Sequence, residues 1–79
     1  MSPTVLVVGP YRLFFFSREE TRIHVHVSCA DGEAKFWLEP AIHLANHVGL
    51  NQHTLKRMER IIEEYENEIR TAWRRHFQR

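Results

Sequence analysis

Two alternating segments on either side of Asp31-Gly32 constrain the fold of this chain more than any other feature. Apolar and polar residues alternate strictly over residues 22–28, which predicts a half-buried strand. Residues 33–39 alternate as well, and an Asp-Gly pair between two such runs is typical of a two-residue hairpin turn. With Asp31 and Gly32 as the loop, the hairpin register follows. It predicts four opposing pairs: Ala30 with Glu33, Ser28 with Lys35, His26 with Trp37, and His24 with Glu39.

The same alternation divides the predicted hairpin into two faces. One face carries four apolar residues that we expect in the core: Val25, Val27, Phe36 and Leu38. The other collects side chains that can carry acid/base chemistry, charge or stacking: His24, His26, Ser28, Lys35, Trp37 and Glu39. Function is therefore expected on this second face.

Length and composition bound the class of protein. Seventy-nine residues fit one domain, residues 1–79, near the lower size for a self-sufficient apolar core, so cooperation with a partner chain or a second copy is an open alternative. A net charge of +1 gives no general case for nucleic-acid binding, which must rest on local patches. The lone Cys29 excludes an intrachain disulfide. The first ten residues lack a basic leader and meet Gly9-Pro10 early, so we expect a cytoplasmic protein with no membrane segment.

The remaining segments predict the rest of the fold. Residues 4–8 and 11–16 are β-rich runs joined at Gly9-Pro10, which predicts a first hairpin. Residues 13–16 are apolar on both faces, as in a buried strand or one whose aromatic rings meet a partner. After Pro40, apolar residues at helical spacing predict a short helix that ends at Gly49.

A long C-terminal helix is predicted next. Asn51 is the expected N-cap, and one apolar stripe from Leu55 to Phe77 has no residue that breaks it. The predicted fold is α+β: an antiparallel sheet of about four strands, formed by two hairpins, packed by a short helix and a long C-terminal helix.

The polar hairpin face suggests acid/base chemistry. A carboxylate opposite an imidazole, here Glu39 facing His24, would set its tautomer, while His26 could supply a second proton-transfer group. Lys35 could offset negative charge on a phosphate. Together, these histidine, carboxylate and lysine side chains would suit metal-independent RNA cleavage. A binding surface and a plain solvated face remain alternatives. The candidate binding residues are Trp37, which could stack on a base, with Arg22 and Ser28 beside it.

The sequence contains three other candidate sites: a metal site, a DNA-binding motif and an arginine patch. The pairs His24/His26 and His43/His47 have metal-ligand spacing, but without a second cysteine or an HExxH motif we predict no metal and no cofactor. A DNA-reading helix-turn-helix would use Lys56, Arg57 and Arg60, whereas the acidic residues that follow would repel DNA. Four arginines near the C-terminus form a candidate patch for phosphate or an acidic partner, with a solvated helix end as the alternative: Arg70, Arg74, Arg75 and Arg79.

Several motifs also carry a family resemblance. His24-Val25-His26-Val27, followed after Asp31-Gly32 by Lys35-Phe36-Trp37-Leu38-Glu39-Pro40, resembles domain-of-unknown-function family 4160 of small prokaryotic proteins. Members of that family typically have Pro-His before the HxHV motif, where this chain has Arg22-Ile23. The resemblance implies the toxin half of a type II toxin-antitoxin module, with a cognate antitoxin as partner. The residues that match the family's motif are His24, His26, Lys35, Phe36 and Trp37. The resemblance implies no molecular target.

Two functional hypotheses follow. The first is a toxin component that inhibits growth through the HVHV/KFW face, acting on RNA, with its status as an enzyme left open. The second is a non-enzymatic interaction module or regulator, antitoxin-like or DNA-binding, that acts with a neighbouring gene product.

Overall fold

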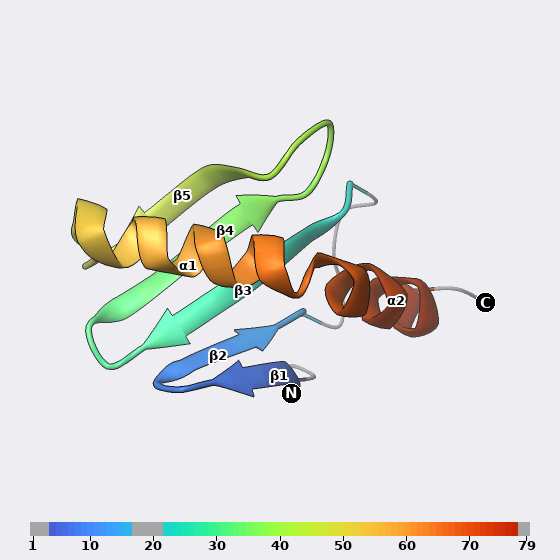
Figure 1. Cartoon of the computed structure of the whole chain (residues 1–79), viewed down its shortest axis with the longest axis horizontal. Coiled ribbons are helices and arrows are strands. Elements are labelled where there is room, and N and C mark those ends of the chain that lie inside the picture. Colours follow the sequence, from blue (N-terminus) through green and yellow to red (C-terminus); the bar gives the residue numbers. More distant parts are fainter. Residues whose placement is uncertain (1–3, 17–21, 78–79) are drawn as a thin grey trace.

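The structure is a computed structural model that describes residues 4–16 and 22–77. Within these residues, five strands form one antiparallel sheet in chain order, and two helices follow (Figure 1). The strands are β1 (Thr4–Val8), β2 (Tyr11–Phe14), β3 (His24–Cys29), β4 (Gly32–Trp37) and β5 (His43–Val48), and the helices are α1 (Gln52–Glu64) and α2 (Glu66–Phe77). The α+β class and the antiparallel sheet are confirmed, whereas the expected four strands are five.

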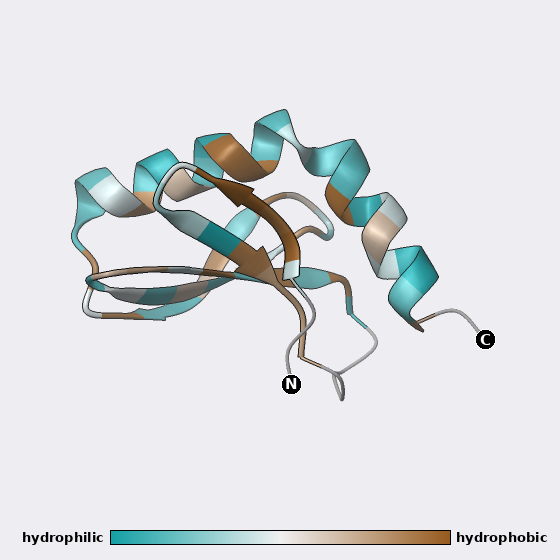
Figure 2. Ribbon diagram, turned by 90° about the horizontal axis from the view of Figure 1, so that it is seen from below, coloured by the Kyte–Doolittle hydropathy of each residue, from teal (hydrophilic) through white to brown (hydrophobic). Residues whose placement is uncertain are grey.

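The core lies between one face of the sheet and the helices. In Figure 2, α1 runs across that face, and α2 turns away from it and passes the end of the sheet. The four hairpin residues expected in the core are all buried: Val25, Val27, Phe36 and Leu38. Leu55, Met58 and Ile62 of α1 meet them through the predicted apolar stripe. No helix of the described residues is long and apolar enough to cross a membrane.

The first hairpin forms as predicted. Val8 pairs with Tyr11, so Gly9 and Pro10 are the two loop residues. Gly9 adopts a φ of 58°, a left-handed conformation that glycine tolerates at the first corner of such a turn.

The predicted register of the second hairpin is wrong by two residues. Cys29 pairs with Gly32, so the loop is Ala30-Asp31 rather than Asp31-Gly32. Gly32 is needed inside the ladder instead, because a Cβ there would come within 1.9 Å of the Val48 carbonyl oxygen. A slip of two residues keeps both faces but changes every neighbour. The observed pairs are His24 with Trp37, His26 with Lys35, and Ser28 with Glu33.

The short helix predicted after Pro40 is also wrong. Residues 43–48 form strand β5, which pairs with β4. Leu44 and Val48, expected on a buried helical face, are 37% and 72% exposed. The hydrogen bonds with β4 therefore determine the conformation of this segment, despite the helical spacing of its apolar residues. The helix-turn-helix alternative loses its first helix.

The predicted C-terminal helix is two helices. Asn51 is the N-cap as expected, its side chain accepting a hydrogen bond from the Thr54 amide at 2.8 Å. At Tyr65 the backbone leaves helical geometry, with φ −105° and ψ 22°, although no proline or glycine is present. The change of direction lets α2 leave the sheet face and pack Trp73 at the sheet end (Figure 1).

Candidate functional site

The face of the sheet opposite the core is not covered by either helix of the described residues (Figure 2). We call it the open face. Its central residues come from three neighbouring strands whose registers place them together: Arg12 and Phe14 of β2, His24, His26 and Ser28 of β3, and Glu33, Lys35 and Trp37 of β4. The predicted division of the hairpin residues between two faces is thus confirmed.

His26 lies within an aromatic cluster. Its ring stacks on Phe14, with 5.3 Å between centroids and 21° between planes, and meets the Phe16 ring at 4.4 Å. Phe14 is only 4% exposed and His26 only 7%, although no helix covers them. Among the described residues, rings of the same face pack against both side chains.

His24 is completely buried at the end of β3. Its Nδ1 lies 2.7 Å from the carbonyl oxygen of Arg22. The rings of Trp37 and Trp73 approach it, with centroids at 5.4 and 5.1 Å. Trp73 reaches this position because α2 passes the end of the sheet. Sequence reasoning placed Trp73 only in the helical stripe, because a helical period does not tell which strand the helix meets.

Trp37 is flanked by two cations. The Arg22 guanidinium carbon lies 4.1 Å from the Trp37 ring centroid, and the Lys35 ammonium nitrogen lies 4.3 Å from it. The same guanidinium donates hydrogen bonds to the Glu39 carbonyl oxygen, at 2.7 Å from Nη2 and 3.1 Å from Nε. A third cation, Arg12, lies 4.5 Å from the Phe14 centroid. Cations and rings thus alternate across the open face, and such contacts are attractive.

Glu39 does not face His24 as predicted. Trp37 occupies that position in the ladder, and the Glu39 carboxylate lies at the rim, 4.0 Å from Nη1 of Arg70. The proposed His24–Glu39 acid/base pair is therefore not assembled. Catalytic roles for His24, His26, Lys35 and Glu39 stay predictions.

The remaining predicted binding residues are spread over the molecule. Ser28 lies on the open face, half-buried between Arg12 and Glu33 in the register. Arg74 and Arg75 are exposed on α2, with Arg74 Nη2 3.4 Å from the Thr71 hydroxyl. Arg70 instead donates hydrogen bonds to the Glu66 carboxylate and the Leu38 carbonyl oxygen, each at 2.8 Å, and Arg79 lies outside the described residues. The structure thus brings Arg22, Ser28, Lys35 and Trp37 to one face and leaves the two α2 arginines elsewhere.

Among residues 4–16 and 22–77, no three metal-ligating side chains lie close enough to hold an ion. A register shift in β5 places His43 opposite Trp37 and His47 opposite Ala34, residues of different sheet faces.

Comparison with known proteins gives one match. Residues 11–74 match the family model described as "Domain of unknown function (DUF4160)". The match covers β2 to most of α2 and so includes the open face. Searches among curated proteins and among solved structures found no match.

Proposed function

The chain belongs to the DUF4160 family, and we propose that it is a toxin component of a type II toxin-antitoxin module that binds RNA through its open face. The toxin role extends the family resemblance, and the RNA target is argued from the arrangement of cations and rings. A cognate antitoxin that covers the same face would neutralise the toxin.

The observation that carries the proposal is the environment of Arg22. Its guanidinium is exposed and is held by two neutral groups, the Glu39 carbonyl oxygen and the Trp37 ring. Neither group cancels its positive charge. An arginine fixed in this way retains its attraction for phosphate while losing little side-chain freedom on binding.

The rings beside these cations favour single-stranded RNA over duplex. Unpaired bases stack on aromatic side chains and on arginine guanidinium planes, whereas a duplex hides its bases. Trp37 with Arg22 offers such a platform, and Phe16, 41% exposed, offers a second ring on the same face. The open face therefore combines a phosphate-attracting group with stacking surfaces.

The geometry supports binding more than cleavage. General acid/base catalysis requires groups within hydrogen-bond reach of the substrate. His24 is completely buried and Glu39 is at the rim beside Arg70. His26, 7% exposed, is the one histidine of the pair with any surface access, so the enzymatic alternative rests on it.

The test is RNA binding by fluorescence anisotropy with a labelled single-stranded oligonucleotide of mixed sequence. We expect Trp37→Ala to weaken binding by about 10- to 100-fold, since stacking of a base contributes about 1–3 kcal/mol. Arg22→Ala should weaken binding and reduce the slope of log affinity against log salt concentration by about 1, because one phosphate contact is lost. Arg60→Ala is the matched control, because Arg60 is exposed on α1, beyond the core from the open face.

Three outcomes contradict the proposal: no RNA binding by folded wild-type protein at low salt, an equal loss in Arg60→Ala, or no growth inhibition on overexpression without the neighbouring gene. New RNA ends that disappear in His26→Ala would instead support the enzymatic alternative. Stable co-purification with the neighbouring gene product, without growth inhibition, would support the interaction module.

A further inference from the structure

The outer edge of β1 ends the sheet on one side and is unusually apolar for an edge. Its sequence is Thr-Val-Leu-Val-Val, and Val7 is 64% exposed. Edge strands expose backbone donors and acceptors, and proteins usually protect them with charged residues, proline or bulges. β1 has one irregularity, between Thr4 and Leu6, but no charged residue and no proline. It is therefore suited to pair with another strand.

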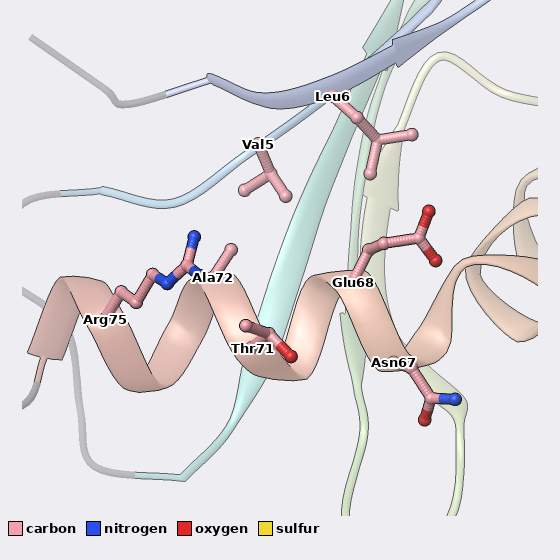
Figure 3. Close-up of a pocket in the computed structure, with 7 residues that line it drawn as sticks. All are labelled: Val5, Leu6, Asn67, Glu68, Thr71, Ala72 and Arg75. Atoms are coloured by element: carbon pink, nitrogen blue, oxygen red, sulfur yellow. The ribbon is translucent and has the colours of Figure 1, made fainter.

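A groove runs beside this edge, between β1 and α2 (Figure 3). Its volume is about 520 Å³. Val5 and Leu6 line it from β1, and α2 contributes Asn67, Glu68, Thr71, Ala72 and Arg75. Figure 3 shows Glu68 and Arg75 towards opposite ends of the α2 segment, with the smaller Thr71 and Ala72 between them.

We infer that β1 and this groove form an interface between two copies of the chain, in which the two β1 strands pair antiparallel. The charges on α2 identify a second copy as the occupant. Glu68 and Arg75 are seven residues apart, about 10 Å along the helix axis. A two-fold axis near Thr71 and Ala72 sets the two α2 helices antiparallel. Glu68 of each copy then faces Arg75 of the other, as an isologous interface requires.

This arrangement would extend the sheet across both copies and keep both sets of helices on one side. The two open faces would lie next to each other on the other side. The inference does not depend on RNA binding, since Glu68 and Arg75 lie on α2, which does not cover the open face. Its failure would therefore leave the proposed function untouched.

Sedimentation velocity over a range of concentrations tests the interface. We expect wild-type protein to associate reversibly to a dimer. Glu68→Arg and Arg75→Glu should each weaken the dimer about tenfold or more. In a two-fold dimer each substitution is present in both copies, so it creates two pairs of like charges across the interface. The double variant Glu68→Arg/Arg75→Glu should restore association, because the exchanged charges still face each other. A different partner protein would not give this recovery.

A matched pair of edge variants locates the contact. Val7→Lys places a charge on the exposed edge strand and should abolish dimerisation. Val48→Lys makes the same change on β5, the opposite edge, where Val48 is 72% exposed, and should have no effect. A monomeric wild type, a dimer insensitive to Val7→Lys, or a double charge exchange without recovery would each overturn the inference. Circular dichroism of each variant confirms that the monomer fold is intact.

Discussion

Phe14 and Phe15 are neighbours in the chain, yet they are buried in two different ways. Phe15 is 1% exposed and packs under α2, with its ring centroid 5.3 Å from Trp73 and 6.0 Å from Phe77. Phe14 is 4% exposed on the open face, where Arg12, Phe16 and His26 surround it. Helix α2 packs on the first ring, whereas the described neighbours of the second ring are side chains of its own sheet face.

This difference has a functional consequence. Side chains under a helix are held in a close-packed interior and cannot meet a ligand. On the open face, the described neighbours of Phe14 and His26 are cations and rings of the same face, and the proposed ligand would contact these groups. The covered face stabilises the fold, and the open face is the part of the molecule to which the proposed function assigns RNA binding.

The largest effect is expected from removing the ring on the covered face. Phe15→Ala should lower the free energy of unfolding by about 4 kcal/mol, because the helix and sheet around it cannot collapse fully into the cavity. Urea denaturation followed by circular dichroism measures the loss. Phe16→Ala is the control, since Phe16 is 41% exposed, and it should cost about 1 kcal/mol or less. Equal losses for Phe15 and Phe16 would contradict the division between the two faces.

A smaller effect is expected for the neighbouring ring. Phe14→Ala should cost about 2 kcal/mol, because the surface side chains Arg12 and Phe16 can move into the space and water can enter it. The same variant should also weaken RNA binding, since the rings beside His26 would lose their order. A loss as large as that of Phe15→Ala would mean that the open face is packed as rigidly as the core.

The covered face was predictable from sequence, and the contacts of the open face were not. Alternation over residues 22–38 placed the apolar residues of the hairpin on the covered face correctly, because a strand sends successive side chains to opposite faces whatever its register. It did not predict that His24 and His26, on the other face, are buried as well. The opposing pairs depended on which two residues form the turn. An Asp-Gly pair favours the loop, but the close approach of the Val48 carbonyl requires Gly32 within the ladder. The Val48 carbonyl belongs to a strand that follows sixteen residues after Gly32. A local sequence pattern cannot predict this contact.

The remaining errors have a similar origin. Residues 43–48 have a spacing compatible with a helix, and only pairing with β4 makes them a strand. The helix break at Tyr65 has no proline or glycine to indicate it, and it serves the contact of Trp73 with Phe15 and His24. Long-range contacts decided each of these elements, so the site's most buried histidine could not be located from sequence.

His24 is the residue where the two faces meet, since α2 of the covered side supplies the Trp73 ring against it. His24→Phe keeps an aromatic ring but removes the partner of the Arg22 carbonyl oxygen, and it should cost about 1 kcal/mol. His53→Phe, an exposed position on α1, is the matched control and should be neutral. Thermal unfolding compares the two. Wild-type stability in His24→Phe would contradict a contribution of the Arg22 contact to the fold.

The smallest effect is expected at the rim, where Glu39 tests whether charge or acid/base chemistry matters on the open face. Its carboxylate lies 4.0 Å from Arg70 with 58% of the side chain exposed, so Glu39→Gln should lower the unfolding free energy by less than about 0.5 kcal/mol. Removing a negative charge at the rim of the open face should strengthen RNA binding slightly and most visibly at low salt, because the charge repels phosphate and salt screens this repulsion. Anisotropy titrations at two salt concentrations measure it. If Glu39 were a general acid or base, Glu39→Gln would instead cause a large loss of growth inhibition with unchanged RNA affinity. That result would support the enzymatic hypothesis.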